Sequence, residues 1–97
     1  MAARIRMTPD TMRMRASDYR AEGENLQDII GRMDVLLNQL QDEWEGDASV
    51  AYAERFNELR PGFVAAKELI DSIATALEKT AQSLEEVDAQ LAAQFRG

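Results

Sequence analysis

Two long stretches of the chain carry apolar residues at alternating steps of three and four positions. The steps before Trp44 reach Leu40, Leu37, Met33, Ile30, Leu26, Gly23, Tyr19, Ala16 and Met12. The steps from Tyr52 onward reach Phe56, Leu59, Phe63, Ala66, Ile70, Ile73, Leu77, Thr80, Leu84, Val87 and Leu91. An apolar repeat of 3.5 residues makes a narrow stripe on a helix, which must be buried against another helix. The pattern therefore predicts two helices that meet near Trp44.

Local signals set the ends of these helices within a single domain, residues 1–97. Thr8, Pro9 and Asp10 form a helix start, which predicts a first helix over residues 8–43. Gly46 suits a left-handed cap at the end of that helix, and Asp47 can cap the next one. The second helix is expected over residues 48–94.

The connection over residues 44–46 is too short for anything but an antiparallel helix pair, so the fold class is an all-α helical hairpin. Pro61 lies inside the second helix, where proline costs about 3 kcal/mol. The heptad phase continues unchanged from Leu59 to Phe63, so we expect a kink there and not a third helix.

The apolar stripes are wider than a single hairpin can bury. Ile29 and Leu36 flank the first stripe, and Leu69 widens the second beside Ile73. We predict that these four residues form an interface with a second hairpin, which completes an elongated four-helix bundle. The pattern leaves open whether the second hairpin is identical to the first.

Charge and composition narrow the functions that the chain can have. The formal net charge of −7 repels nucleic acid phosphates, so no nucleic-acid partner is expected. Arginine is concentrated in the first fifth of the chain. In an antiparallel hairpin that stretch lies beside the acidic second half and can be neutralised by it. The acidic residues there are Glu68, Asp71, Glu78, Glu85, Glu86 and Asp88.

Catalytic and metal-binding chemistry is not expected. The chain contains no cysteine and no histidine, and it has no glycine-rich phosphate loop or paired nucleophile and base. Helical spacing places the carboxylates mostly on solvated faces, so we predict no enzyme activity, no metal site and no cofactor.

Targeting signals are also lacking. No apolar run approaches the ~20 residues that span a bilayer, and residues 1–10 have no apolar core of a secretory signal. Composition alone would thus favour a soluble cytoplasmic protein. The apolar stripe of the first helix is committed to the hairpin, so no membrane interaction is expected.

Trp44, Glu45 and Gly46 lie between two heptad stretches in a chain of 97 residues. This arrangement resembles the WXG family of hundred-residue type VII secretion substrates, related to the early secreted antigen target proteins, and the resemblance covers essentially the whole chain. Leu84, Asp88, Leu91 and Phe95 also match the C-terminal pattern of its Firmicute members. Leu84 and Leu91 are heptad positions in any case, but helix packing does not require Phe95. The tyrosine-containing pattern of the actinobacterial branch is missing.

The resemblance implies a folded dimer that a membrane-embedded type VII ATPase exports from the cytoplasm without a cleaved leader. The partner is then a second copy, as the Firmicute branch favours, or a paralogous WXG protein. A composite signal would recognise Trp44 and Gly46 at the bend, together with Leu84, Asp88, Leu91 and Phe95 of the C-terminal helix. The alternative is an intracellular helical adaptor, or a co-secretion partner without an export signal of its own. Membrane disruption by an opened hairpin is a third interpretation.

Overall fold

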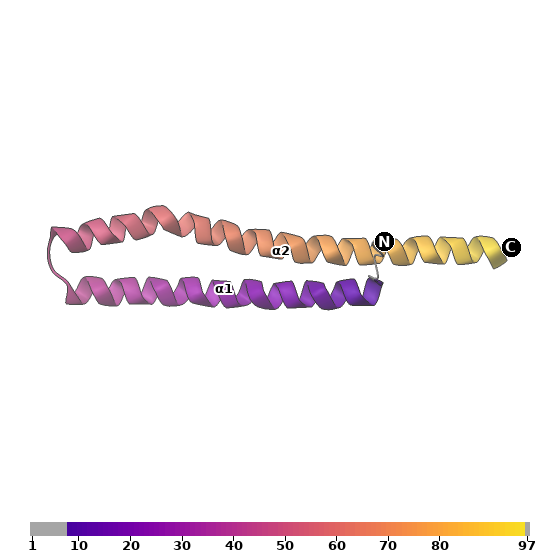
Figure 1. Ribbon diagram of the computed structural model, residues 1–97, viewed down its shortest axis with the longest axis horizontal. Helices are drawn as coiled ribbons and strands as arrows, with labels where there is room; N and C mark the ends of the chain where they lie inside the picture. Colours follow the sequence, from indigo (N-terminus) through magenta and orange to yellow (C-terminus); the bar gives the residue numbers. More distant parts are fainter. Residues whose placement is uncertain (1–7, 97) are drawn as a thin grey trace, which may run out of the picture.

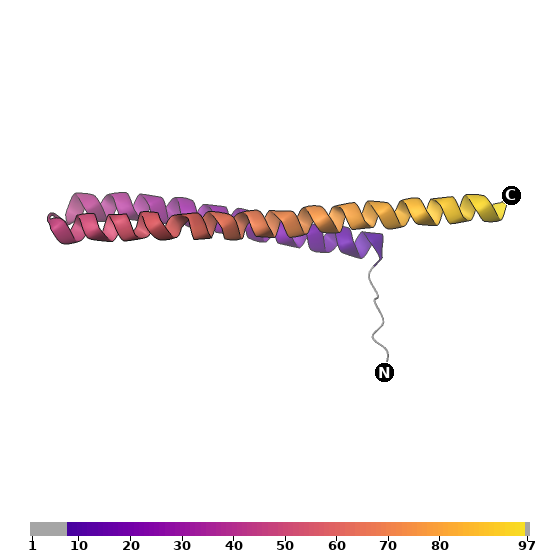
Figure 2. The same cartoon turned by 90° about the horizontal axis from the view of Figure 1, so that it is seen from above.

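The computed structural model describes residues 8–96, which form two long antiparallel helices (Figure 1). Helix α1 spans Pro9–Glu43 and helix α2 spans Asp47–Arg96. The molecule measures 78 × 29 × 16 Å, and the two helices cross each other at a shallow angle (Figure 2). The described residues contain no strand. The predicted all-α hairpin is therefore confirmed.

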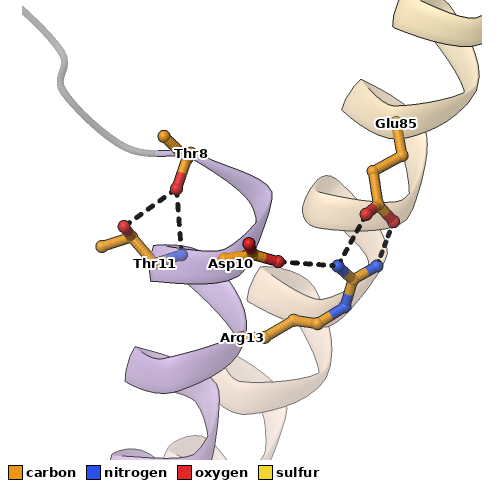
Figure 3. Close-up of polar contacts among 5 residues, drawn as sticks. All are labelled: Thr8, Asp10, Thr11, Arg13 and Glu85. Carbon is orange, nitrogen blue, oxygen red and sulfur yellow. Dashed lines mark hydrogen bonds and ion pairs between the residues drawn. The ribbon is translucent and has the colours of Figure 1, made fainter.

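Helix α1 begins as the sequence predicts. The side-chain oxygen of Thr8 accepts a hydrogen bond of 3.2 Å from the backbone N–H of Thr11 (Figure 3). Pro9 occupies the first turn, where its missing N–H costs nothing, and the carboxylate of Asp10 lies at the positive end of the helix dipole. These three residues fix where the helix starts and so set its register against α2.

The bend differs from the prediction that Gly46 caps the first helix and Asp47 caps the second. Helix α1 ends at Trp44, whose extended backbone donates its N–H to the carbonyl of Leu40 at 2.9 Å. Gly46 does have a positive φ of 121°. Its carbonyl, however, accepts from Ser49 N–H at 3.1 Å, so Gly46 belongs to the start of α2 and does not cap α1. Asp47 is accordingly the first residue of α2 and not its cap.

The core between the helices is built mainly from small residues. On α1 the buried positions belong to the predicted stripe: Met12, Ala16, Gly23 and Ile30. On α2 the buried positions are Ser49, Ala53, Ala74 and Ala81. Three of these, Ala53, Ala74 and Ala81, lie one residue after a position of the predicted stripe. The α2 stripe was therefore placed one position away from the face that contacts α1, because a heptad marks hydrophobicity and not side-chain size.

Many large side chains of the predicted α2 stripe stay accessible in the single hairpin, whereas Phe56, Ile70, Ile73 and Leu77 are half-buried. The six accessible ones remain 38–53% exposed: Tyr52, Leu59, Phe63, Leu84, Val87 and Leu91. Small residues at the helix contact let the two backbones approach closely, and the bulky residues then lie along one flank. A single hairpin cannot bury that flank.

The other flank is held by ion pairs between the helices. Arg13 binds Glu85 through both guanidinium NH groups (Figure 3). About two turns further along α1, Arg20 binds Glu78. For Arg13 and Arg20 these contacts confirm the predicted neutralisation by the acidic second half. Arg15 pairs instead with Asp18 of its own helix, and Arg4 and Arg6 lie outside the described residues. Toward the bend, Arg60 of α2 donates two hydrogen bonds of 2.9 and 2.8 Å to Asp34 of α1.

The two helices are unequal in length, and α2 continues as one helix through Pro61. Because Arg13 lies against Glu85, the first turn of α1 lies level with residues near 89. The last part of α2 therefore extends beyond α1, with no helix of the same hairpin beside it (Figure 1). Neither helix contains a stretch long and apolar enough to cross a bilayer within the described residues.

Candidate docking surface

An apolar groove runs between the helices near the bend. One part of it is a hollow of about 260 Å³, which is lined by Met33, Leu36, Leu37, Leu40, Tyr52 and Phe56. A second hollow of about 240 Å³ shares Met33, Tyr52 and Phe56, and it adds Arg55, Leu59 and Phe63. The shared residues join both hollows into one open surface, which we call the apolar groove.

Buried Ile30, which is 2% exposed, separates this groove from the ion-pair flank. Met33 follows it by three residues and Asp34 by four, so the two side chains lie on opposite sides of the buried line. One side of the hairpin is thus closed by charged pairs, and the other is open and apolar.

The four residues predicted to form a dimer interface lie at different distances from this groove. Leu36 lines it and is 62% exposed, and Ile29 lies about two turns earlier on the same side of α1. On α2, Leu69 is exposed and Ile73 is half-buried, and both lie further from the bend. Leu69 lines neither hollow. The structure thus brings Leu36 to the groove itself, and the interface stays a prediction.

Trp44 stands at the bend end of the groove. Its ring packs against Tyr52 with the centroids 6.2 Å apart and the planes tilted by 55°. An aromatic pair in such a tilted arrangement contributes ~0.5–1.5 kcal/mol beyond the area that it buries. The indole nevertheless remains 39% exposed. Trp44 therefore extends the groove with a large apolar surface that is only partly covered within the chain.

The predicted C-terminal recognition residues lie at the opposite end of the molecule. Leu84, Asp88, Leu91 and Phe95 are all exposed residues of α2, and their spacing of four, three and four places them on one face. Phe95 is 89% exposed. At 1.5 Å per residue, Asp88 lies roughly 60 Å along the helix from the start of α2. The structure therefore separates the six predicted recognition residues into two distant groups, with Trp44 and Gly46 at the bend.

The ion pairs between the helices lower the pKa values of two carboxylates. The hydrogen bonds from Arg13 lower the pKa of Glu85 below its ordinary value. Those from Arg60 lower the pKa of Asp34 in the same way. Residues 8–96 contain no group of three or more His, Cys, Asp or Glu side chains that could hold a metal ion. The charged residues of this flank thus hold the two helices together.

Sequence reasoning had assigned Tyr52, Phe56 and Phe63 to the contact between the two helices, and the groove was missed for that reason. The available signal was the alanine that directly follows several stripe positions, such as Ala53 after Tyr52. A small residue next to a large one on the same helix indicates which of the two faces the closer neighbour.

The sequence matches known proteins over nearly its whole length. A family model described as proteins of 100 residues with WXG matches residues 4–89. Protein YukE of Bacillus subtilis is 33% identical over 97 residues, all of this chain and all of that protein. The type VII secretion system extracellular protein A of Staphylococcus aureus strain USA300 is 27% identical over 93 residues, 96% of each chain.

Solved structures agree with this similarity. A crystal structure of EsxA from Geobacillus thermodenitrificans superimposes with a TM-score of 0.83 at 36% identity, covering 94% of this chain and 100% of that one. The secreted protein EsxB of Bacillus anthracis gives a TM-score of 0.80 at 21% identity, over 90% and 99% of the two chains. The second match concerns the fold alone.

Proposed function

Because the chain belongs to the family of proteins of 100 residues with WXG, we propose that it is a secreted substrate of a bacterial type VII secretion system and not an enzyme. The name of the staphylococcal relative, an extracellular protein of such a system, supports this function. The observation that carries the proposal is the exposure of Trp44 beside an open apolar groove, with the C-terminal stripe exposed at the far end. Both surfaces are available to be recognised.

The first step of the proposal is a dimer in which a second copy of the chain covers the apolar groove. Large exposed apolar areas on a small protein mark interaction sites, and a helix pair completes a four-helix bundle against another helix pair. Charge disfavours a parallel arrangement of the two copies. The bend region, residues 42–54, carries five acidic residues and no basic one. A parallel pairing would place two such acidic clusters side by side, whereas an antiparallel pairing keeps them apart.

The second step is a composite recognition surface. The C-terminal part of α2 extends past the start of α1. In an antiparallel dimer this extension of one copy passes the bend of the other. Asp88, Leu91 and Phe95 of one copy then lie near Trp44 of its partner, which no single hairpin achieves.

The third step is capture of this surface by the membrane ATPase of the secretion apparatus. An exposed indole next to a short amphipathic helix suits a receptor groove that takes apolar anchors at helical spacing. Asp88 would add a charged contact that fixes the register of the helix in that groove. The protein would be cytoplasmic before export and extracellular afterwards.

Export of point variants tests the proposal. We expect Trp44→Arg and Asp88→Ala each to remove the protein from the culture supernatant, because each deletes one half of the composite surface. Both variants should accumulate in cells as dimers, which light scattering on the purified proteins measures. Glu86→Ala is the matched control, since Glu86 is an exposed acidic residue on another face of the same helix. Normal supernatant levels of both recognition variants would contradict the proposal.

A further inference from the structure

Each helix contains a site of low helix propensity, and the two sites lie at the same level along the hairpin. In α1 this is Gly31, and in α2 it is the pair Pro61 and Gly62. The contact of Asp34 with Arg60 defines the local register. Moving three residues back along α1 from Asp34 corresponds to moving three residues forward along α2 from Arg60, so Gly31 lies level with Phe63. Gly62 is within one residue of that level.

The register is the same on the far side of this level. Gly23 lies against Ile70 and Asp71. In an antiparallel pair with a constant register, the numbers of two facing residues always add up to the same value. The sum at Gly23 is nearly the same as for Asp34 and Arg60, so the register does not change between these contacts. The alignment of Gly31 with Gly62 is thus bracketed by contacts on both sides.

Helix packing does not require either glycine. A Cβ added at Gly31 or at Gly62 would meet no atom within 4 Å. Gly23 is different, because a Cβ there would lie 2.7 Å from the carboxylate of Asp71. Glycine in a helix interior destabilises it, and Pro61 has no N–H to donate to the carbonyl of Asn57. Sharp bends of helices occur at such residues. Helix α2 is visibly bowed in its bend-side half (Figure 1).

On the bend side of this level, the two helices are tied to each other. Asp34 and Arg60 form a two-point ion pair there. The apolar groove lies on this side as well, and both helices contribute to its lining, with Met33 and Leu37 from α1 and Phe56 from α2. Residues 32–60, which we call the bend segment, are therefore held together as a unit. On the other side, Arg20 with Glu78 and Arg13 with Glu85 hold the longer remainder together.

We infer that the hairpin contains a hinge at Gly31 and Pro61–Gly62, about which the bend segment moves as one body. Buried Ile30 lies next to the hinge and provides the contact on which the two parts pivot. The motion changes the direction of the groove and of Trp44 relative to the longer part of the hairpin. The hinge goes beyond the proposed function, since it is a property of the chain whether or not the chain is exported.

Nuclear magnetic resonance of the full-length protein tests this inference. Residual dipolar couplings of backbone amides report the orientation of each part in a weakly aligned sample. We expect the bend segment to show smaller couplings than the remainder, so that one rigid orientation does not fit both. In the triple variant Gly31→Ala, Pro61→Ala, Gly62→Ala, a single orientation should fit the whole hairpin. A wild-type protein whose couplings fit one rigid body would overturn the inference.

Amide hydrogen exchange gives a second readout that a merely local effect would not produce. Gly31→Ala alone should slow exchange roughly fivefold in its own turn, from the gain in helix propensity. Because the hinge is shared, exchange at residues 62–66 of the other helix should slow as well. The control is Ser17→Ala, which raises helix propensity at an exposed site of α1 away from the hinge. If Gly31→Ala changes only residues of α1, or if Ser17→Ala slows residues 62–66 equally, the hinge is wrong.

Discussion

At the scale of single residues, the same amino acid serves different purposes along this chain. Gly23 is buried at a close approach of the two helices, Gly31 faces open space, and Gly46 adopts a positive φ at the bend. Gly23 is a position of the predicted α1 stripe, and the structure buries it there against α2. The role of Gly46 could not be predicted in the same way. Its place in the sequence suits a cap of either helix, and only the backbone decides which.

The two glycines of α1 predict different responses to alanine. Gly31→Ala should stabilise the fold by about 0.5–1 kcal/mol, since the added methyl meets no neighbour. Gly23→Ala gains the same helix propensity, but the methyl displaces the Asp71 carboxylate, which is paired with Lys67 at 2.5 Å. We therefore expect Gly23→Ala to be no more stable than the wild type. Urea unfolding followed by circular dichroism measures both, and a Gly23→Ala protein as stabilised as Gly31→Ala would contradict this account.

At the scale of elements, each helix presents three surfaces: a narrow contact of small residues, a charged flank and an apolar flank. The sequence predicted both helices and the buried face of α1. It placed the buried face of α2 one position off, because Tyr52 and Ala53 are both apolar and the heptad cannot tell them apart by size. The arginine-rich start beside the acidic second half was predictable from composition. The individual partners, such as Arg13 with Glu85, required the register of the two helices.

The charged flank predicts a loss of stability in acid. The pKa of Glu85 is lowered in the folded state by its hydrogen bonds with Arg13. A lowered folded pKa means that the stabilisation is complete above the unfolded pKa, about 4.3 for glutamate, and is lost as the pH falls through the folded pKa. Glu85→Gln removes the charge, so it should be less stable than the wild type at pH 7. The effect is small because the pair is exposed.

Urea midpoints of wild type and Glu85→Gln across the pH range measure this difference. The two midpoints should begin to converge below the unfolded pKa and should meet once the pH has fallen through the lower folded pKa, since Glu85 is then neutral in both states. Glu86→Gln is the control, because within residues 8–96 Glu86 bonds with Gln82 and with no arginine, so its midpoint should follow the wild type throughout. A difference between wild type and Glu85→Gln that persists unchanged into acid would show that the ion pair is not its cause.

At the scale of the whole molecule, a hairpin with a core of small residues leaves most of its large apolar side chains uncovered. The sequence predicted that a second hairpin is needed, because the stripes were too wide for one partner. It could not predict which residues form the groove, since that depends on how α2 is rotated against α1. The predicted bend at residues 44–46 and second helix over residues 48–94 did place Trp44 and Phe95 at opposite ends of one hairpin, so that any surface containing both needs a second copy.

The apolar groove predicts how single charges affect assembly. Leu36 and Val35 are neighbours in the sequence and are similarly exposed, at 62% and 56%. Leu36 lines the apolar groove, whereas Val35 lies on a different face of α1, beside Gln27, Asp28 and Arg32. Leu36→Glu places a carboxylate where the second copy must pack, and burying an unpaired charge is costly. Val35→Glu adds the same charge to a surface that remains in water.

We therefore expect wild type and Val35→Glu to sediment at twice the chain mass of 10.9 kDa, and Leu36→Glu to sediment as a single chain at the same concentration. Circular dichroism should show that all three proteins keep their helices, since Leu36 is largely exposed in the hairpin itself. Equal dissociation of both variants would mean that added charge, and not the groove, controls assembly. A Leu36→Glu protein that stays dimeric would show that the interface lies on another face of the hairpin.

Because the composite surface needs two copies, the dissociated Leu36→Glu protein should also fail to reach the culture supernatant, although Trp44, Asp88 and Phe95 are all intact.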